Sequence, residues 1–429
     1  MSEPAGGDRK ASTLWRHRDF LRLWAAAAIS GFGARITRDG LPIAAVLALG
    51  AEPAQVGILA ALSRGPRFLV GLFAGGRIDR APKRPVLVAA DLVRAAMLAA
   101  VPFAALTHVL NLWWLYAAAA VVGAASAAFE MAHHAYLPSL IGKEDLIEGN
   151  TKLSVTDNVA EIGGPALAGG LFTLLTAPVA LAVNAGTYAL SAVFLFMIRG
   201  RHDTGSVDEA PPEHPFSDAI AGARAALGHP LVRPLVMMEV TMALFGSFFS
   251  ALYSFFALRT LGLPPALLGL TISVGGVGAV IGALSVQTLV RRFGVGPAMT
   301  GCAVIGAGFN LFVPLAPVGA YGGAASLMVA QLFSDGLLTA AFILTGSLRQ
   351  TVLPNSVLAR VSGAVFVATG LVGIGGALLG GWLGGTVGAR PVLWVATLGI
   401  WAATLFILFS PLRSLKAAPV AEDALTDPA

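Results

Sequence analysis

The sequence predicts an all-α membrane protein in which twelve transmembrane helices form two pseudo-symmetric six-helix bundles. Composition is the first observation: of 429 residues, 56% are hydrophobic and only 12% are charged, and the mean hydropathy is +0.78. A soluble chain of this length has too little interior to hide so much apolar surface. The other two observations are apolar runs that recur from end to end and a repeat that relates the two halves. Alternating strands of about ten residues, which mark a transmembrane barrel, do not occur.

The apolar runs are each long enough to cross a bilayer, which takes about 20 residues. The twelve expected spans are roughly 19–49, 54–78, 85–108, 111–137, 149–175, 178–199, 231–260, 265–290, 296–316, 320–350, 357–386 and 390–411. The one long polar stretch between spans, 200–218, separates six spans from six. We therefore expect a tail at 1–18, bundles at 19–199 and 231–411, a linker at 200–230 and a tail at 412–429. Within these, 219–228 is expected to form a short surface helix and 416–429 to be disordered.

The distribution of lysine and arginine predicts the orientation, because cytoplasmic loops carry an excess of both. Alternate connections hold Arg16, Arg18, Arg22, Arg77, Arg80, Lys83, Arg84, Lys143, Arg199, Arg201, Arg291, Arg292, Arg349, Arg360, Arg413 and Lys416. The intervening connections hold only Arg259 and Arg390. Both termini and the linker are therefore expected on the cytoplasmic side of the cell's inner membrane. The net charge of +5 is then a topology signal and predicts no nucleic-acid partner. The single Cys302 excludes an internal disulfide.

The two halves share three short segments at a spacing of about 212 residues, which predicts parallel six-helix repeats with a site between them. The matching pairs are 49–57 with 261–269, 162–170 with 374–381, and Leu137-Pro138 with Leu353-Pro354. Such repeats place the substrate site near the middle of the membrane.

A charged turn after the second span carries a further resemblance. Gly75-Gly-Arg-Ile-Asp79-Arg80-Ala-Pro-Lys83-Arg84 is similar to the signature loop of the major facilitator superfamily, and Asp91 and Arg94 follow where that signature ends. The segment 164–170, Gly-Pro-Ala-Leu-Ala-Gly-Gly, resembles the helix-five motif of its exporters. Over residues 15–411 the chain resembles the twelve-helix drug/proton antiporter branch of this superfamily.

The resemblance implies a conformational gate and has three departures. The implied gate residues are Gly75, Asp79, Arg80, Lys83, Arg84, Asp91, Arg94, Gly164, Pro165 and Arg360. Asp79 would cap a helix end of the second half near Arg360, because the positive end of a helix attracts a carboxylate. Pro82 and Ala168 replace usual glycines, and 115–123 lacks the arginine that many drug exporters carry early in helix four.

Ionisable residues lie at membrane depth, where a charged side chain costs at least about 2.5–3.5 kcal/mol unless it faces a bundle interior or a wet cavity. In the resembled fold, helices 1, 4, 7 and 10 line the cavity, and helices 2, 5, 8 and 11 join the halves. The deep residues of the first half are Arg35, Arg38 and Asp39 on helix 1, Arg64 and Arg67 on helix 2, Glu130, His133 and His134 on helix 4, and Asp157 and Glu161 on helix 5. Those of the second half are Glu239 on helix 7 and Asp335 on helix 10.

Helical spacing places three pairs one turn apart: Arg35 with Asp39, Glu130 with His134, and Asp157 with Glu161. Four arginines match four acids in the first half, so a nearly neutral network is expected. We interpret Arg35, Arg38, Arg64, Arg67, Glu239 and Asp335 as substrate-binding, and Asp39, Glu130, His133, His134, Asp157 and Glu161 as proton-coupling residues. Protonating a carboxylate frees its arginine partner for an anion. The alternative is a structural ion-pair network that holds the first bundle together.

These features predict a secondary active transporter that exports a small acidic or zwitterionic organic molecule or drug, by alternating access with proton antiport, as in multidrug resistance. An importer or flippase of an anionic amphiphile is the alternative; an intramembrane enzyme or a metal exporter is more remote. No nucleophile motif or ATP-binding loop occurs, so no enzyme activity or cofactor is expected. Glu130-x-x-His133 has a metal-ligand spacing, but only one copy is present, so no metal is expected. The expected partners are the bilayer, the substrate and protons, and the chain is expected to be a monomer.

Overall fold

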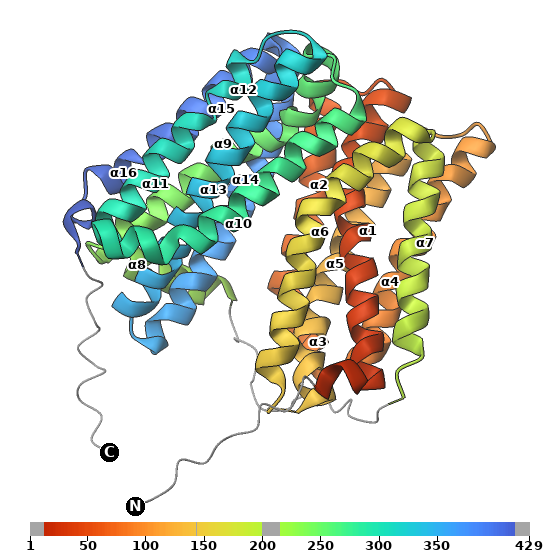
Figure 1. Ribbon diagram of the computed structural model, residues 1–429, viewed down its shortest axis with the longest axis horizontal. Helices are drawn as coiled ribbons and strands as arrows, with labels where there is room; N and C mark the ends of the chain where they lie inside the picture. The colour runs from red at the N-terminus through yellow and green to blue at the C-terminus, as the bar shows by residue number, and fades with distance from the viewer. Residues whose placement is uncertain (1–12, 143, 200–214, 417–429) are drawn as a thin grey trace, which may run out of the picture.

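The computed structural model describes residues 13–142, 144–199 and 215–416, and these residues form helices and connecting loops without a strand (Figure 1). The predicted N-terminal tail up to residue 12, Lys143, the linker residues 200–214 and the predicted disordered tail from 417 onward lie outside the described residues. The all-helical membrane fold that the sequence predicts is confirmed for the described chain.

The first half consists of η1 (Thr13–Arg16), α1 (Arg18–Ala48), α2 (Pro53–Phe73), α3 (Gly75–Arg80), α4 (Lys83–Leu106), α5 (Leu112–Ile141), α6 (Leu146–Leu174) and α7 (Ala177–Phe196). The second half consists of α8 (Pro215–Gly228), α9 (Val232–Phe255), the π-helical turn η2 (Phe256–Thr260), α10 (Pro265–Phe293), α11 (Val295–Phe309), α12 (Phe312–Leu315), α13 (Ala320–Val352), α14 (Asn355–Val387), α15 (Ala389–Ala403), α16 (Leu405–Leu408) and η3 (Pro411–Ser414).

Ten helical segments of the described chain are long and apolar enough to cross a membrane. Three of them are composite, since α9 continues into η2, α11 into α12, and α15 into α16. The helices α1 and α6, with 31 and 29 residues, are long enough as well, but charged side chains lower their hydropathy. Together they make the twelve predicted spans. The second span is shorter than the predicted 54–78, because α2 ends at Phe73 and the chain turns at Ala74 into the separate helix α3.

The repeat in the sequence has a direct structural cause. Gly50 and Gly262, at equivalent places in the two repeats, have φ angles of +64° and +74°, a backbone region that favours glycine because it has no Cβ. Pro53 and Pro265 then open α2 and α10, where the fixed φ of proline suits the first helical turn and its missing N–H is not needed. Each repeat therefore codes the same turn followed by the same helix start.

The two halves contact each other mainly through two equivalent helix pairs, α2 with α14 and α6 with α10. Glycine permits both contacts. A Cβ atom on Gly57 would lie 2.7 Å from the Ala377 carbonyl oxygen and 2.7 Å from the Gly381 Cα atom. In the other pair, Gly169 and Gly269 meet in the same way, with Cα 3.1 Å from the position of each other's Cβ. These four glycines belong to the matching segments of the repeat, so the segments that resemble each other pack at the junction of the halves.

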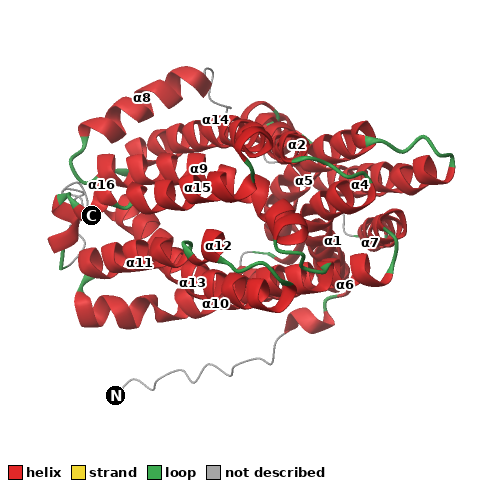
Figure 2. Cartoon of the chain, turned by 90° about the horizontal axis from the view of Figure 1, so that it is seen from above, coloured by secondary structure: helices red, strands yellow, loops and turns green. Residues whose placement is uncertain are grey.

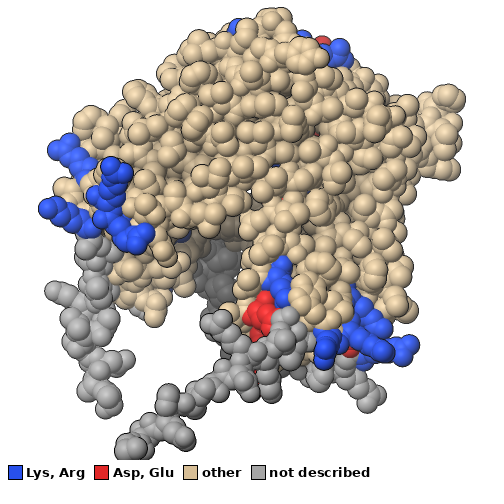
Figure 3. Space-filling view, in the orientation of Figure 1, with Lys and Arg blue, Asp and Glu red and all other residues tan. Residues whose placement is uncertain are grey.

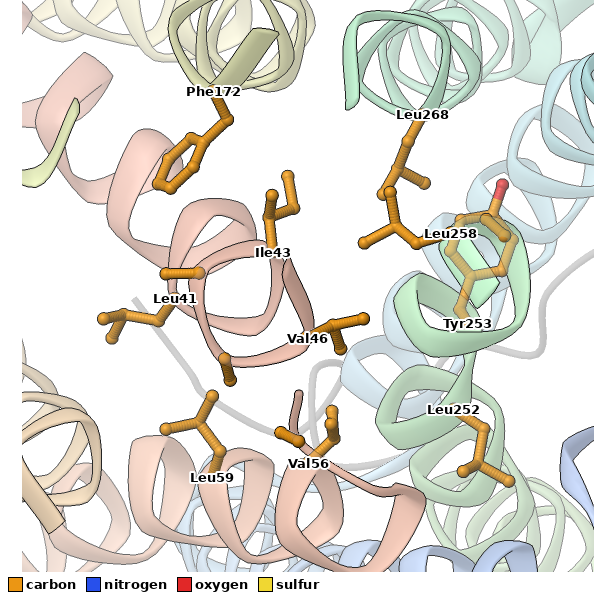
Figure 4. Packing of buried hydrophobic residues seen from close by; sticks show 14 of the residues in the cluster. Leu41, Ile43, Val46, Val56, Leu59, Phe172, Leu252, Tyr253, Leu258 and Leu268 are labelled. Atoms are coloured by element: carbon orange, nitrogen blue, oxygen red, sulfur yellow. The ribbon is translucent and has the colours of Figure 1, made fainter. Parts of the chain in front are cut away.

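One hydrophobic core crosses between the halves at the end of the molecule opposite η1 and η3, which we call the sealed end. Its side chains come from α1, α2 and α6 of the first half and from α9, η2 and α10 of the second; Leu41, Ile43, Val46, Val56, Leu59, Phe172, Leu252, Tyr253, Leu258 and Leu268 belong to it (Figure 4). At the other end, the open end, each half has its own core: Phe20 and Tyr136 belong to one, Met299 and Leu348 to the other.

The molecule is therefore closed at one end and divided at the other. The two halves lean together at the sealed end and separate toward the open end (Figure 1). The space-filling view shows a hollow between the halves on the same side (Figure 3). Blue and red side chains gather near the open end, while the middle of the visible face is almost free of charge, as expected for a surface in contact with acyl chains. The helix α8 lies along the outer side of the second half (Figure 2) and packs on α14.

Candidate functional site

A pocket of about 410 Å³ lies between the halves, formed by α2 of the first and by α9 and α14 of the second. It is lined by Arg64, Arg67, Phe68, Met242, Ala243, Gly246, Ser247, Phe366, Thr369, Gly370 and Gly373. The first half supplies both guanidinium groups, and the second half supplies hydroxyl, apolar and glycine surface. The rings of Phe68 and Phe366 meet across the junction with their centroids 5.5 Å apart. The volume falls in the range of small-molecule sites.

Arg64 is the unusual residue of this pocket. Its Nη1 donates to Ser247 Oγ at 2.9 Å and its Nη2 donates to Ser250 Oγ at 2.9 Å, both on α9 of the other half. Within the described chain it has no carboxylate partner. By helical rise, Arg64 lies about 16 Å from the sealed end of α2, near mid-depth. A guanidinium at this depth that is bonded only to neutral oxygens can still bind an anion.

Arg67, one turn further along α2, forms an ion pair with Glu130 of α5. Both side chains remain about half exposed, at 49% and 46%. An ion pair with that exposure is screened and contributes little to stability, so its partners can exchange with water or a ligand. Arg67 and Glu130 are therefore better suited to a water-accessible binding site than to an ion pair that stabilises the bundle.

A second cluster joins α1 to α6. Glu161 forms an ion pair with Arg35 and a second one with Arg38, whose Nη1 lies 2.8 Å from Glu161 Oε1. Arg38 also bonds Asp39, with Nε 3.2 Å from Oδ1. Arg35 and Asp39 are one helical turn apart but do not bond each other, because the guanidinium of Arg35 extends to Glu161 on the neighbouring helix and Asp39 bonds Arg38. Glu161 thus holds two arginines at once.

Two of the acids predicted at membrane depth have no ion-pair or hydrogen-bond partner within the described chain: Asp157 on α6 and Asp335 on α13. Asp157 is exposed, and its Oδ1 lies 3.9 Å from where a Cβ on Gly31 of α1 would be. Asp335 packs on Gly275 of α10, where the absence of a side chain leaves room for the carboxylate. The nearly neutral network predicted for the first half is therefore incomplete, since Arg64 and Asp157 stay outside it.

The histidine pair occupies two different environments. His133 is buried and its ring stacks on Phe129 with centroids 5.9 Å apart, whereas His134 is exposed. No hydrogen bond links His134 to Glu130 in the described structure; Glu130 bonds Arg67 instead. No group of three or more metal-ligating side chains occurs among the described residues.

In the second half, Glu239 of α9 is paired with Arg349 of α13, at 3.1 Å between Oε2 and Nη1. The two side chains are 14% and 18% exposed. The carboxylate of Glu239 is therefore ion-paired in this structure. Its partner could not be recognised from the sequence, because Arg349 fits the topology pattern equally well.

The comparisons with known proteins agree with this geometry. The model of the Major Facilitator Superfamily matches residues 23–377. The chain belongs to this superfamily. It is 26% identical over 385 residues to the MFS-type transporter YfiS of Bacillus subtilis (strain 168), covering 86% of this chain and 88% of that one. It is 28% identical over 391 residues to the enterobactin exporter EntS of Salmonella typhimurium, covering 86% and 87%.

Solved structures show the same fold. A bacterial homologue of the iron transporter ferroportin, crystallised in an inward-facing state, superposes with a TM-score of 0.72 at 18% identity, over 92% of this chain and 99% of that one. A POT family transporter in complex with 5-aminolevulinic acid also gives 0.72, at 11% identity. The predicted superfamily is thus confirmed, and the chain is a multi-pass membrane transporter rather than an enzyme.

The signature loop of this superfamily member is fixed by backbone carbonyls. Lys83 donates to the carbonyl oxygens of Ile78 and Ala81 at 3.0 Å each, and also to that of Asp79. Arg84 donates to two carbonyls at the end of α7, Leu195 and Phe196. Among the described residues, Asp79 and Arg80 form no hydrogen bond or ion pair with the second half. The predicted contact of Asp79 near Arg360 is absent here because the halves are apart at the open end.

The remaining gate candidates are distributed over both halves. Asp91 and Arg94 form a buried ion pair inside the first half, 0% and 2% exposed. Gly75 faces Met131, Gly164 packs directly on the side chain of Arg35, and the carbonyl of Pro165 faces Gly269. The carbonyl of Arg360 fills the space beside Gly222 of α8. Gly164 therefore borders the charged cluster, and Pro165 borders the junction of the halves.

Sequence reasoning missed Ser247 and Ser250, the serines that hold Arg64. A hydroxyl in an apolar span gives little signal alone, because serine is common in transmembrane helices. The repeat contains the missing signal: at the spacing of about 212 residues, Ser247 and Ser250 occupy the positions of Arg35 and Arg38. Two aromatic residues close to them along the chain, Phe248 and Phe256, are buried in the core, at 4% and 0% exposed.

Proposed function

We propose that this chain exports a small organic molecule carrying an acidic group, alone or within a zwitterion, by alternating access in exchange for protons. Arg64 is the observation that carries the proposal. It lines the pocket between the halves and has only neutral hydroxyl partners. A carboxylate or similar anion offers that guanidinium two parallel hydrogen bonds, which are stronger than bonds to hydroxyls. The enterobactin exporters among the relatives support the direction of transport.

The remainder of the pocket supports an organic rather than an inorganic anion. Phe68, Met242 and Phe366 provide an apolar wall beside Arg64. Binding sites for organic molecules combine such a wall with a few placed polar groups. An inorganic ion would leave this wall in contact with water, whereas an aromatic or aliphatic body would cover it.

The acids supply the proposed proton site. Glu130 and Glu161 each neutralise arginines, and protonating either carboxylate would release a guanidinium toward the hollow. Asp157 and Asp335 have no cation bound to them in the described chain and are free to take up a proton directly. Exchange of a proton for the substrate's anionic group at these arginines would couple the two fluxes.

The proposed orientation has both termini in the cytoplasm of the cell and the chain in its inner membrane, as the basic residues near the open end indicate. The described conformation is then open to the cytoplasm, which is the state in which an exporter takes up its substrate. The ferroportin homologue of the same fold was crystallised in that state.

Transport in proteoliposomes tests the proposal. Purified protein would be reconstituted with a defined pH gradient and assayed with enterobactin and with benzoate, which carries one carboxylate on a ring. Because a charge-assisted hydrogen bond contributes about 1.5–3 kcal/mol, Arg64→Gln should weaken the apparent affinity for the anion by about 10–150-fold. Arg291→Gln, an exposed arginine at the end of α10, is the matched control and should transport normally. Unchanged transport in Arg64→Gln would remove the site assignment.

The direction of flux separates the alternative function. An apolar pocket wall and an arginine also suit an anionic amphiphile that is imported or flipped between leaflets. Flux toward the side that carries the termini, or transfer of a labelled anionic lipid between leaflets, would favour this alternative. Proton-driven flux of a water-soluble anion away from that side favours export.

A further inference from the structure

We infer that Arg64, Ser247 and Ser250 form a latch between the halves, and that the anionic group of the substrate opens this latch when it binds. The inference rests on the proposed function and adds a direction to it. The serines are competitors of the substrate for Arg64. Substrate binding and release of the sealed end become one event.

The contacts between the halves single out this latch. Five hydrogen bonds join the first half to the second within the described chain, and no ion pair does. They run from Arg64 to Ser247, from Arg64 to Ser250, from Ala166 N–H to Ser273 Oγ, from Ala266 N–H to Thr173 Oγ1 and from Arg259 to the Val46 carbonyl. The other three each use a backbone atom. Only the two bonds of Arg64 join side chain to side chain, and only they line the pocket.

The hydrogen bonds of the two serine hydroxyls indicate that their interaction with Arg64 is weak and can be replaced. Ser247 donates its own proton to the Ala243 carbonyl at 2.7 Å, and Ser250 donates to the Ser247 carbonyl at 3.3 Å. Each serine oxygen therefore serves Arg64 only as a neutral acceptor. A carboxylate is the stronger acceptor for the same two N–H groups. Because Nη1 and Nη2 are the atoms already in use, an anion bound to both of them displaces both serines.

Displacing the serines changes the balance between conformations. The latch joins α2 to α9, and these helices belong to different halves, so movement at the sealed end that separates the halves breaks it. A ligand shifts such an equilibrium only if it binds one state better than the other. An anion binds the state with the open latch better, because in that state Ser247 and Ser250 no longer occupy the guanidinium of Arg64.

The latch predicts an effect opposite in sign to that of ordinary binding residues. If the serines only formed part of the site, replacing them would weaken anion binding. As competitors, their removal should strengthen anion binding and should favour opening of the sealed end without any ligand. The double variant Ser247→Ala/Ser250→Ala therefore distinguishes the two roles.

The experiment reports opening at the sealed end by cysteine labelling. Cys302 is buried and would be replaced by alanine, and Ala54→Cys would be the reporter. Ala54 lies in the first turn of α2, and its Cβ is 3.7 Å from where a Cβ on Gly385 of α14 would be, so α14 covers it partly when this end is closed. The rate of maleimide labelling in nanodiscs would be measured without ligand, with benzoate, and with benzamide, a neutral analogue of similar shape.

We expect the double serine variant to label about tenfold faster than the parent without ligand, a shift of about 1.4 kcal/mol. Ser285→Ala is the matched control, because Ser285 bonds only the Gly282 carbonyl of its own helix, at 2.7 Å, and it should label at the parent rate. Benzoate should accelerate labelling of the parent, and benzamide should not. In the serine variant benzoate should bind more tightly, and in Arg64→Gln it should have no effect.

Three results would overturn the latch: a serine variant that labels no faster than Ser285→Ala, benzoate binding weakened by the serine substitutions, or equal effects of benzoate and benzamide on the parent. The labelling difference without ligand does not depend on transport. A failure of the proposed export activity would therefore leave that arm of the test intact.

Discussion

The junction of the halves makes a sharp prediction about glycine. The substitution Gly57→Ala places a Cβ 2.7 Å from both the Ala377 carbonyl oxygen and the Gly381 Cα atom, where an ordinary contact is 3.4–4 Å. The helices α2 and α14 would have to separate by about 1 Å, and overpacking of this kind costs about 1–3 kcal/mol. The cost applies only while the sealed end is closed. We therefore expect the population to shift about 5–150-fold toward the state in which this end is open.

Gly65→Ala on the same helix is the matched control. A Cβ there would meet only Ile374 Cδ1 at 3.8 Å, an ordinary contact. Both substitutions gain the same helix propensity, up to about 1 kcal/mol, so this effect cancels in the comparison. Trp113 and Tyr321 are exposed where α5 and α13 begin at the sealed end. Spin labels at these two positions would report the distance between the halves by pulsed electron–electron double resonance.

We expect a longer distance to gain population in Gly57→Ala and to remain at the parent level in Gly65→Ala. Indistinguishable distributions in the two variants would refute the argument that backbone contact at Gly57 closes this end. The equivalent junction repeats the test, since Gly169→Ala would press on the backbone of α10 whereas Gly170→Ala meets nothing within 4 Å.

Two further predictions concern arginines. Arg259→Gln removes the 2.7 Å bond to the Val46 carbonyl across the sealed end, so the same spin labels should show more of the open population. Arg390→Gln, which loses a bond within the second half, should not, and equal behaviour of both would contradict the role of Arg259. Arg94→Gln leaves the buried carboxylate of Asp91 without its cation, and thermal unfolding in detergent should show a loss of about 3–5 kcal/mol. A loss no larger than that of the exposed Arg233→Gln would contradict this.

The sequence was sufficient for the fold because the bilayer restricts it so strongly. Span length and the arrangement of lysine and arginine follow from the thickness and asymmetry of the membrane, and neither requires knowledge of side-chain contacts. Gly50, Pro53 and Gly57 could also be interpreted correctly, since each acts through the backbone. The error at 54–78 arose where this restriction ends: past Phe73 the chain leaves the apolar run, and composition no longer determines where a helix stops.

The charged residues show where sequence reasoning fails. Their expected depth in the membrane follows from their position along a helix. Their partners do not follow, because a long side chain can reach a neighbouring helix as easily as its own. Asp39 bonds Arg38 and not Arg35, and Glu161 binds Arg35 from another helix. Balancing four arginines against four acids could not show that Arg64 would bond serines instead.

The repeat explains why the pocket lies where it does. In the first half, Arg35 and Arg38 of α1 face Glu161 of α6, and charged side chains fill this space. At the spacing of about 212 residues, the equivalent positions of the second half hold Ser247, Ser250 and Gly373.

The contact between Arg35 and Glu161 has a counterpart in the second half, since a Cβ on Gly373 would lie 3.3 Å from Ser247 Oγ. Three small residues leave empty the volume that two arginines and a glutamate occupy in the first half. Arg64 enters this volume from α2, and Gly373 and Ser247 line the resulting pocket. The wall that the second half contributes to the pocket is thus the uncharged counterpart of the ion cluster.

Filling the pocket should abolish binding. We expect Gly373→Leu to prevent benzoate from accelerating labelling at Ala54→Cys, whereas Gly375→Leu, where nothing lies within 4 Å, should leave that response unchanged. An unaltered response in Gly373→Leu would place the anion outside this pocket.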